Sequence, residues 1–304
     1  MIQNKYIVKL EGGLGNQLFQ YTHALALCLR YGGIIILDKH AFNKKQIRQC
    51  ALENYKLNNN VRFKRSTLQK LLTCYFLLVN HLAVKFGWTH AEKGYHTLSK
   101  FGLYYQYQIR WFDSFVKPIM PVNYVTGNWL SSKFFEGAEE CIRNDLKYQK
   151  NLPEKCNEFL AEILQSEAVC IHIRLGDYIA PQWKDKLYVC TPDYYHQAMA
   201  LIREKVKNPR FFVFSNRPKD FEMIRNEYDL GNVIYVDMGN SDVEDMELMR
   251  NCKHFIMSNS TYSWWAQYLS ENERKVVVAP SRFNNYPEWD MTDIYQENWE
   301  IVEI

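Results

Sequence analysis

The sequence predicts an α/β protein with two Rossmann-like domains facing a cleft and a parallel sheet in the C-terminal domain. Near the start, a strand-like run at residues 6–10 leads into a glycine-rich turn, a long helical run and a second strand that ends at Asp38. From about residue 168 onward, apolar strand-like runs alternate with helical runs, which is the pattern of a parallel, doubly wound sheet. A length of 304 residues is sufficient for two domains with separate cores.

The predicted domain boundary lies in a polar stretch at residues 148–156, which contains Pro153. It divides the chain into an N-terminal domain of residues 1–155 and a C-terminal domain of residues 156–304.

Beyond the opening strands, the first domain shows helical patterns over residues 66–90 and 132–147. Residues 101–115 are rich in aromatic side chains and alternate partly, which fits strands or an aromatic-lined loop. Trp129 is expected in the core rather than stacked on a ligand.

In the second domain, a first helix is expected at residues 154–165 and then a regular series follows. The predicted strands lie near residues 168–174, 210–215, 232–237, 254–258 and 275–279. The predicted helices lie near residues 192–206, 218–228, 241–252 and 261–270. Thr191 and Pro192 form a favourable helix start, and Ser241 with Glu244 forms a capping box.

The composition is that of a globular protein, with 47% hydrophobic and 23% charged residues. A net charge of +3 is weak and argues against a dedicated nucleic-acid-binding protein, which carries a concentrated basic face. None of the eight cysteines forms a CxxC pair, so we expect buried, reduced thiols in a cytoplasmic protein.

The most apolar window, residues 71–84, is too short to span a bilayer and lies between Lys70 and Lys85. We expect a packed helix there, with peripheral membrane contact as the alternative. The strand-like run close to the first residue argues against a signal peptide.

The first glycine-rich turn, EGGLGNQLFQ at residues 11–20, precedes a helix and can bring backbone and amide groups close to a ligand. Its candidate ligand-binding residues are Gly13, Gly15, Asn16 and Gln17. Asp38 suits the acidic position of a dinucleotide-binding fingerprint, but Leu18 replaces the third glycine. Nicotinamide or flavin binding, a tight turn without a ligand, and a turn facing another ligand therefore stay open.

A second candidate site follows the central strand, VCIHIRLGDY at residues 169–178. The two-residue period of a strand places His172 and Arg174 on one face, and Asp177 follows in the turn. Ligands of open α/β sheets bind outside the carboxyl ends of the strands, so these three residues are candidates for catalysis. Taken singly, His172 also fits a hydrogen-bonded core histidine and Asp177 a turn cap.

Polar residues follow two other predicted strands of the second domain. They are Ser215, Asn216, Ser258, Asn259, Ser260 and Thr261. Hydroxyl and amide groups at a helix start suit a phosphate, although N-capping alone would also explain residues 258–261. No His, Cys or Asp cluster has metal-ligand spacing, and we predict no metal site; the acids at residues 242–245 offset a helix dipole.

Three motifs occur in order along the chain: LEGGLGNQLFQY near the start, HIRLGDY in the middle, and EDMELMRNCKHFIMSNSTYSWWAQYLS near the end. Together they resemble the bacterial and animal α-1,2-fucosyltransferases of glycosyltransferase family eleven. The resemblance implies a GT-B architecture, GDP-β-L-fucose as donor, and metal-independent, inverting transfer to O2 of a terminal galactose. It also implies a glycan acceptor, no further cofactor, and an acceptor-side N-terminal domain. The implied setting is the bacterial cytoplasm, with the membrane periphery as an alternative.

Carried onto this sequence, the resemblance makes Arg174 the ligand of the donor pyrophosphate. Asp177 is then the first candidate for the general base and His172 the second, while Asn16 would orient the acceptor. The first turn is expected on the acceptor side and residues 258–261 at the donor pocket.

Two positions depart from the pattern of that family. Leu175 stands where a second arginine is common, and Asn216 with Arg217 stands where an acidic pair is common. Arg217 would partly replace the lost charge, and a different GDP-deoxysugar stays open as donor.

Two other functions stay open at this point. One is a Rossmann oxidoreductase that uses Gly13, Gly15 and Asp38 to bind NAD(P). The other is a GDP-sugar- or glycan-binding protein without turnover. The acceptor glycan and the oligomeric state are not predicted.

Overall fold

The computed structural model describes residues 3–42, 49–64, 71, 75, 78, 82, 85, 92–106 and 108–304. The chain divides into two compact units. The N-terminal unit comprises Met1–Gln149 and Thr292–Ile294, and the C-terminal unit comprises Lys150–Met291 and Tyr295–Ile304. Most of the predicted helix at residues 66–90 lies outside the described residues. No helix in the described part of the chain is long and apolar enough to cross a membrane.

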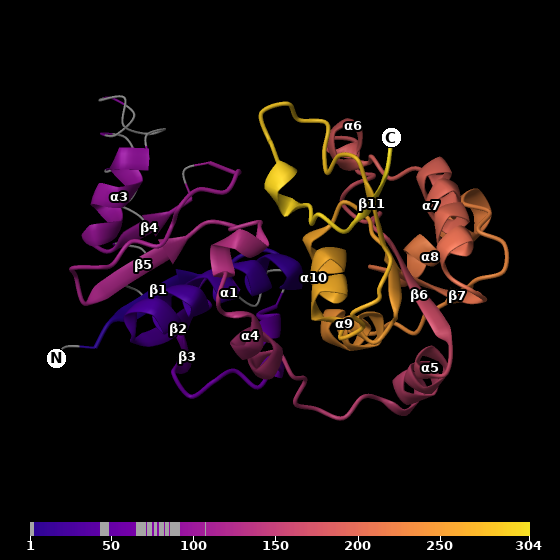
Figure 1. The fold of residues 1–304 in the computed structure, drawn as a ribbon, viewed down its shortest axis with the longest axis horizontal. Coiled ribbons are helices and arrows are strands. Elements are labelled where there is room, and N and C mark those ends of the chain that lie inside the picture. The colour runs from indigo at the N-terminus through magenta and orange to yellow at the C-terminus, as the bar shows by residue number, and fades with distance from the viewer. Residues whose placement is uncertain are drawn as a thin grey trace. The chain divides into compact units, whose positions relative to one another are not determined.

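The N-terminal unit is built on a five-stranded sheet in which every strand pair is parallel, in the order β3-β2-β1-β5-β4 (Figure 1). The strands are β1 (Lys5–Lys9), β2 (Ile34–Asp38), β3 (Val61–Lys64), β4 (Leu103–Tyr105) and β5 (Val122–Thr126). Helix α1 (Leu14–Tyr31) connects β1 to β2, as a parallel pair requires. The sheet extends the predicted β-loop-α-β opening by three strands.

The remaining elements of this unit are η1 (Ala51–Asn54), α3 (Glu92–Lys100), η2 (Ser132–Phe135) and α4 (Glu139–Asp145). The predicted continuous helix over residues 132–147 is therefore wrong. Gly137 interrupts it with a φ of 81°, a conformation that ends a helix and that glycine adopts without strain.

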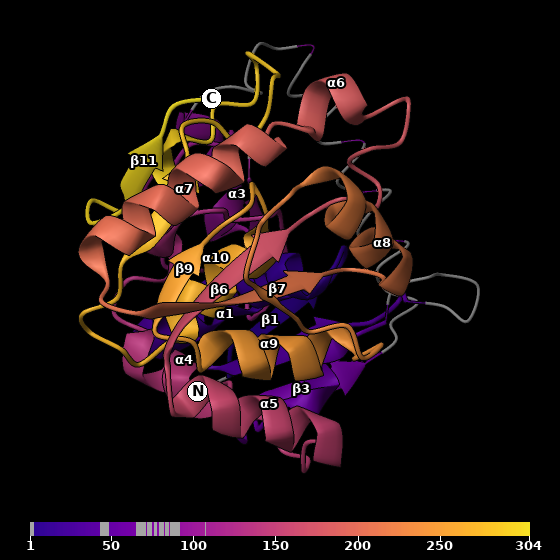
Figure 2. The ribbon, with the colours of Figure 1, turned by 90° about the vertical axis from the view of Figure 1, so that its right-hand side faces the viewer.

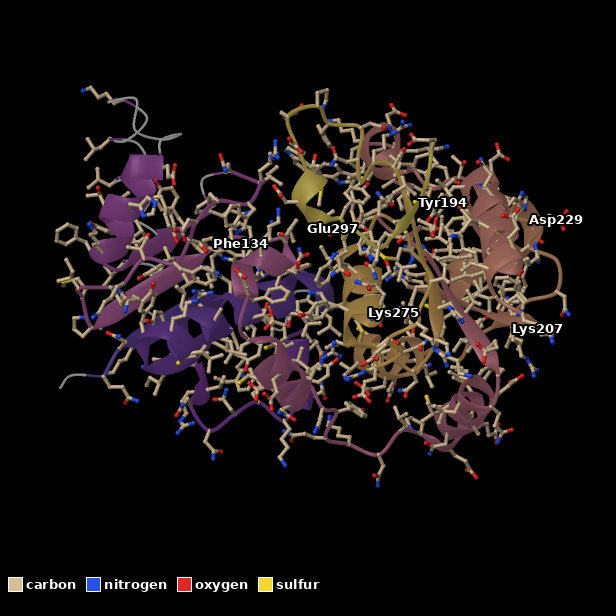
Figure 3. The ribbon with its side chains drawn as sticks, viewed as in Figure 1. Phe134, Tyr194, Lys207, Asp229, Lys275 and Glu297 are labelled. Atoms are coloured by element: carbon tan, nitrogen blue, oxygen red, sulfur yellow. The ribbon has the colours of Figure 1, made fainter. Side chains whose placement is uncertain are left out.

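Trp129 lies in the core of the N-terminal unit, as predicted, and is fully buried. Its ring stacks on the imidazole of His23 from α1, with ring centroids 3.8 Å apart. His23 Nδ1 lies 2.9 Å from the Phe134 carbonyl oxygen, so η2 is held against α1 (Figure 3). Burial lowers the pKa of His23 from 6.5 to about 4, which keeps this imidazole neutral.

The C-terminal unit contains a six-stranded parallel sheet in the order β11-β10-β9-β6-β7-β8. Its strands are β6 (Glu167–Ile173), β7 (Pro209–Ser215), β8 (Ile234–Tyr235), β9 (His254–Ile256), β10 (Val277–Pro280) and β11 (Glu300–Val302). Its helices are α5 (Glu154–Leu164), α6 (Lys184–Leu187), α7 (Pro192–Lys205), α8 (Pro218–Glu227), α9 (Asp242–Arg250) and α10 (Thr261–Leu269). Helix α7 lies on one side of the sheet, and α5 and α9 lie on the other (Figure 2). This arrangement confirms the predicted doubly wound parallel sheet.

Strand β6 shows why both faces of this sheet are covered. Val169, Ile171 and Ile173 are fully buried in one core cluster with Tyr194 and Tyr195 of α7. The intervening residues are also buried on the opposite face. The Tyr194 side chain, labelled in Figure 3, donates a hydrogen bond to the Met257 carbonyl at 2.5 Å.

Two helix starts were predicted in this unit from capping residues, and one of them forms the expected side-chain hydrogen bonds. The Ser241–Glu244 capping box of α9 is present in both directions, as predicted. Thr191 occupies the N-cap position of α7 and Pro192 the first turn, but the Thr191 side chain makes no capping hydrogen bond.

A short segment near the end of the chain, η3 (Thr292–Ile294), belongs to the N-terminal unit. Asp293 accepts hydrogen bonds from Lys133 Nζ at 2.9 Å and from the Trp111 backbone at 3.0 Å. The chain then returns to the C-terminal unit to form β11, a strand that the sequence patterns did not predict.

The buried, neutral His23 makes the N-terminal unit sensitive to acid. Its folded pKa of about 4 lies below the ordinary 6.5, so its contribution is complete above pH 6.5 and is lost as pH falls toward 4. The loss is on the order of 3 kcal/mol at the acid end. We expect His23→Gln to show a shallower fall in unfolding free energy between pH 7.5 and 4.5 than the parent, measured by urea titration with tryptophan fluorescence.

The exposed His40 provides the control, and His40→Gln should follow the parent curve. Parallel curves for His23→Gln and the parent would contradict this role of His23.

Candidate functional site

The candidate site of the C-terminal unit begins at the carboxyl end of β6. β6 pairs with β7 on one side and β9 on the other, so residues that follow these three strands share one sheet edge. His172 is the last but one residue of β6, and its carbonyl accepts a hydrogen bond from the Tyr195 hydroxyl at 3.0 Å. The strand end is therefore fixed both by its neighbours in the sheet and by α7.

His172 is almost completely buried, and its two ring nitrogens differ. Nδ1 lies 3.0 Å from Ser258 Oγ, whereas Nε2 is buried without a hydrogen-bond partner among the described residues. Burial, with a smaller effect from the Arg174 charge, lowers the pKa of His172 to about 3. A neutral ring that accepts from the Ser258 hydroxyl at Nδ1 carries its proton on Nε2, so His172 offers one N–H donor.

This environment does not suit the role of general base that His172 was given as second candidate. An efficient base has a pKa near the operating pH, and His172 lies well below it. In the tautomer whose Nδ1 accepts from the Ser258 hydroxyl, Nε2 is a hydrogen-bond donor instead.

Arg174 and Asp177 are brought together directly after β6. Arg174 Nη2 donates to Asp177 Oδ1 at 2.6 Å, and Arg174 Nε is buried without a partner among the described residues. The Arg174 side chain is 16% exposed and that of Asp177 is 48% exposed. Arg174 is thus a largely buried cation with unused donor capacity, while Asp177 can be reached by solvent.

The turn between β9 and α10 carries residues 258–261 and is held by side chains that bond internally. The Asn259 amide donates to the Leu187 and Phe283 carbonyl oxygens, both at 2.8 Å. Ser260 is the N-cap residue of α10 and accepts from the Tyr262 backbone. Asn259 was predicted to contact a ligand, but its amide protons are already committed, so its side chain shapes the turn. Thr261 begins α10.

Ser215 is the last residue of β7, and Asn216 follows it, level with Arg174 if the register of β6 and β7 is extended by one residue. The Ser215 hydroxyl donates to the Ile173 carbonyl oxygen at 2.9 Å, which ties the ends of β7 and β6 together. Asn216 Oδ1 is a buried acceptor without a partner among the described residues. Arg174 Nε, His172 Nε2 and Asn216 Oδ1 therefore form a set of buried groups with unused hydrogen-bonding capacity.

The structure corrects the expectations for the two residues that depart from the family pattern. Leu175 is fully buried in the core cluster that includes Val189, so a side chain at this position does not face the sheet edge. Arg217 donates through Nε and Nη2 to the carboxylate of Asp220, which is 2% exposed. Its charge is thus engaged at the start of α8 and does not replace one at position 175.

The first turn lies in the N-terminal unit, and its backbone conformation depends on a different glycine from the two that were predicted. Gly13 is the N-cap of α1 with an ordinary φ of −78°, and Gly15 lies inside the helix. Gly12, which the sequence reading did not single out, has a φ of 83°, and an added Cβ would lie 2.7 Å from Asn16 Nδ2. The turn needs glycine at position 12 for both conformation and space.

Two buried glutamines hold this turn. Gln17 donates to the Gly12 and Gln49 carbonyl oxygens and accepts from the Ala51 backbone. Gln20 makes a reciprocal pair of hydrogen bonds with the Glu11 backbone. The prediction that Gln17 binds a ligand is therefore wrong for its side chain, because every group of its amide has a partner inside the unit.

Asp38, the acid of the dinucleotide interpretation, is fully buried and accepts from the His40 backbone at 2.9 Å. A ribose hydroxyl needs an accessible carboxylate, so this geometry argues against NAD(P) binding at the first turn.

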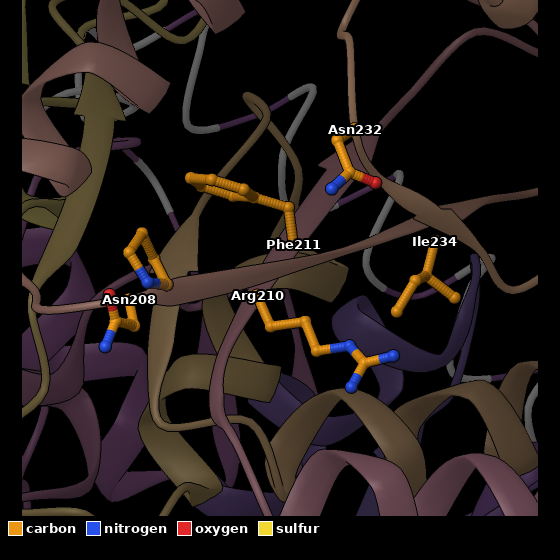
Figure 4. A pocket seen from close by; sticks show the side chains of 6 residues that line it. Asn208, Arg210, Phe211, Asn232 and Ile234 are labelled. Atoms are coloured by element: carbon orange, nitrogen blue, oxygen red, sulfur yellow. The ribbon is translucent and has the colours of Figure 1, made fainter.

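Other polar features lie away from the strand ends described above. A shallow pocket at the amino ends of β7 and β8 is lined by Asn208, Pro209, Arg210, Phe211, Asn232 and Ile234 (Figure 4). Its Arg210 pairs with Glu162 of α5, and ligands of α/β sheets bind at the opposite edge. Within the described residues, no group of three or more His, Cys, Asp or Glu side chains could hold a metal ion.

The sequence reading missed several residues that position the site. Tyr178 donates to the Asn259 carbonyl at 3.1 Å, and the Tyr262 ring lies against His172 with centroids 5.4 Å apart. Both tyrosines lie within or directly beside the motifs. An aromatic residue next to the polar residues of a strand end was therefore the signal that could have identified them. Together with Arg174, these contacts build a rigid, largely desolvated edge with N–H donors, which is suited to an anion.

The chain is similar to several proteins of known class. The family model described as Glycosyl transferase family 11 matches residues 5–303. An α-1,2-colitosyltransferase of Escherichia coli is 25% identical over 302 residues, which cover 98% of each chain. The O-antigen biosynthesis glycosyltransferase WbnK of Escherichia coli is 26% identical, covering 90% of this chain and 93% of that protein. Galactoside α-(1,2)-fucosyltransferase 1 of Oryctolagus cuniculus is 31% identical over 158 residues, covering 48% of this chain and 41% of that protein.

Solved structures support the fold. The fucosyltransferase NodZ from Bradyrhizobium aligns with a TM-score of 0.54 at 13% identity, over 88% of this chain and 93% of that chain. The NodZ α-1,6-fucosyltransferase co-crystallised with GDP aligns with a TM-score of 0.53, over 88% and 92%. The chain therefore has the GT-B-type fold of these fucosyltransferases, as the resemblance implied.

The hydrogen bonds of Asn259 predict a large effect on stability. Asn259→Ala removes both donors and leaves the Leu187 and Phe283 carbonyl oxygens without them, so we expect a loss of about 2–4 kcal/mol of unfolding free energy. Asn285, which is exposed and donates to the Asp185 carbonyl, provides the matched control. Denaturant unfolding of both variants checks this, and equal losses in the two would contradict the role of Asn259.

Proposed function

The chain belongs to glycosyl transferase family 11, and we propose that it is a galactoside α-1,2-fucosyltransferase. It would transfer L-fucose from GDP-β-L-fucose to O2 of a terminal galactose on an oligosaccharide or surface glycan, with inversion at the anomeric carbon. The observation that carries the proposal is the buried donor set after β6, where Arg174 Nε and His172 Nε2 have no partner among the described residues. A diphosphate supplies the acceptor oxygens that these donors lack.

The C-terminal unit is proposed to bind the donor and the N-terminal unit the acceptor. Arg174 contacts the pyrophosphate, supported by the backbone N–H groups at the start of α10. His172 donates from Nε2, and Asn216 Oδ1 accepts from a hydroxyl or N–H group of the same donor. In the N-terminal unit, Asn16 in the first turn of α1 orients the acceptor.

The reaction follows from this placement. The acceptor O2 attacks the anomeric carbon in line, the bond to the GDP oxygen breaks, and GDP leaves with the electron pair. Negative charge grows on the β-phosphate in an oxocarbenium-like transition state. A fixed, desolvated guanidinium at Arg174 stabilises that charge without reorganisation, as preorganised electrostatic groups do.

Asp177 is proposed to take the proton of the acceptor hydroxyl, a contribution of about 10²–10⁴-fold to the rate. In the described structure it is paired with Arg174 at 2.6 Å. A phosphate that binds Arg174 competes for the same donor, so donor binding releases the carboxylate for its role as base. Donor binding would therefore precede productive acceptor binding.

A second candidate is transfer of a different GDP-linked deoxysugar. The similarity to an α-1,2-colitosyltransferase over 98% of both chains favours it, because no residue contact described above distinguishes the two sugars. A GDP-sugar-binding protein without turnover would share the same phosphate contacts.

A donor and acceptor screen with product mass as readout tests these functions. The proposal expects GDP to bind in calorimetry and GDP-fucose to give a fucosylated product with lactose or N-acetyllactosamine. GDP binding with transfer only from another donor selects the second candidate, and GDP binding without any product selects the binding protein. Absence of GDP binding would overturn the donor assignment.

Removal of the Arg174 charge should weaken donor binding. We expect Arg174→Ala to lower GDP affinity roughly 10- to 150-fold, since a hydrogen bond to a charged group contributes about 1.5–3 kcal/mol. Turnover should fall further, because the charge on the leaving phosphate grows in the transition state. Arg217→Ala, whose guanidinium is bound to Asp220, should leave GDP affinity near the parent value in calorimetry. Equal affinity in the parent and Arg174→Ala would exclude the phosphate role.

Asp177→Asn separates binding from catalysis. Loss of the pairing carboxylate leaves Arg174 free, so GDP affinity should hold or rise, while kcat should fall about 10²-fold or more. Initial rates and calorimetry on the same preparation check both effects. If kcat stayed near the parent value, Asp177 would not be the base.

A further inference from the structure

Positive charge is concentrated in one part of the N-terminal unit. Residues 54–135 contain eleven Lys and Arg residues and only two acids, Glu92 and Asp113. Because the whole chain carries a net charge of +3, the remaining residues carry −6. The small net charge of the whole chain is therefore the sum of a strongly basic segment, residues 54–135, and a remainder with a net negative charge.

The same segment exposes large apolar side chains at the amino edge of the sheet. Phe101 precedes β4 and is 63% exposed, and Ile119, Met120 and Val122 precede or begin β5 and are 68%, 45% and 44% exposed. We call these four residues the edge patch. They are contiguous, because the Ile119 backbone donates to the Lys100 carbonyl at 2.8 Å, and a Cβ on Gly102 would lie 3.5 Å from Met120 Cβ.

Basic residues lie next to the edge patch in the sequence or in the sheet. Lys5, Lys100 and Lys117 are all exposed, and the Lys5 backbone donates to the Pro121 carbonyl at 2.8 Å. The candidate site residues of the chain follow the carboxyl ends of strands, whereas the edge patch lies at the amino ends of β1, β4 and β5. Sugar transfer therefore gives no reason for this exposed apolar surface.

A second exposed apolar surface lies earlier in the same segment. Leu71, Tyr75, Leu78, Leu82 and Lys85 are helical, and their spacing of four and three residues places them on one face of a helix. The four apolar side chains, which we call the helical stripe, are between 42% and 70% exposed. Lys85 continues the same spacing after Leu82, and no acid occurs anywhere from residue 54 to residue 91.

We propose that the edge patch and the helical stripe are docking surfaces for an anionic phospholipid bilayer. Apolar side chains among basic ones are the combination by which proteins lie on a membrane, with hydrophobic groups at the acyl boundary and lysines among anionic headgroups. Exposed apolar surface of this kind marks an interaction site, and the charge of the segment selects an anionic partner. The proposal concerns membrane contact and does not depend on which sugar the protein transfers.

Vesicle flotation of the full chain tests this docking. We expect the parent to bind vesicles of phosphatidylcholine with 30% phosphatidylglycerol, to bind pure phosphatidylcholine weakly, and to dissociate as salt is raised. Lys100→Gln with Lys117→Gln should lower partitioning roughly 30-fold at low salt, at about 1 kcal/mol per basic residue. Phe101→Ser with Ile119→Ser, and Leu71→Ser with Leu78→Ser, should each lower it roughly tenfold or more.

Matched controls come from the C-terminal unit. Leu164, which is 56% exposed on α5, should tolerate substitution by Ser, and Lys207→Gln with Lys219→Gln should leave partitioning unchanged. Circular dichroism and denaturant unfolding of every variant confirm that each is folded. Partitioning of the parent that is independent of anionic lipid, or equal in parent and patch variants, would overturn the proposal.

Light scattering on the same samples separates membrane docking from self-association. A parent dimer that becomes a monomer in the patch variants, with no vesicle binding in either form, would assign the two surfaces to a second copy and overturn the proposal.

Discussion

The hydrogen bond between His172 and Ser258 determines much of the structure at the carboxyl ends of β6, β7 and β9, the sheet edge where the sugar donor is proposed to bind. It joins the end of β6 to the turn between β9 and α10, so the two strand ends cannot move independently. The ring is buried and neutral, and its contact with Ser258 fixes the direction in which Nε2 points. Tyr195 and Tyr178 donate hydrogen bonds to backbone carbonyls on the two sides of this link, so contacts within the unit hold the whole edge in place. Such preorganisation is what an enzyme needs where charge develops during the reaction.

Few charged side chains lie at this edge of the sheet. Arg174 is the cation among the candidate residues, and its partner Asp177 is the more exposed of the two. Arg217 lies nearby in the sequence but is neutralised by the buried Asp220, and position 175 points into the core. The proposed catalytic acid–base chemistry and phosphate binding therefore share one ion pair. A substrate that separates this pair changes both functions at once.

Periodicity and strand spacing were sufficient to predict the alternating strands and helices of the C-terminal unit apart from α6 and β11, because its long strands are apolar and its longer helices show helical periodicity. These patterns were insufficient where the conformation of a single residue determines the course of the backbone. Gly137 splits the predicted helix over residues 132–147, and Gly12 rather than Gly13 holds the first turn in the left-handed region. The roles of Gln17 and Asn259 could not be read from residue type, since the same amide can bind a ligand or a distant carbonyl. Only the partners at Gln49, Ala51, Leu187 and Phe283, far away in sequence, decide between these roles.

The short segment Thr292–Ile294 has a consequence for biosynthesis. Asp293 completes a cluster with Lys133 and Arg110 of the N-terminal unit, yet it follows Lys133 by 160 residues in the sequence. β11, the edge strand of the other sheet, follows within a few residues. Neither unit therefore completes its contacts until residues 292–302 have been synthesised, although most of the N-terminal unit is made much earlier. Until Asp293 has been synthesised, Lys133 and Arg110 lack its carboxylate as an ion-pair partner.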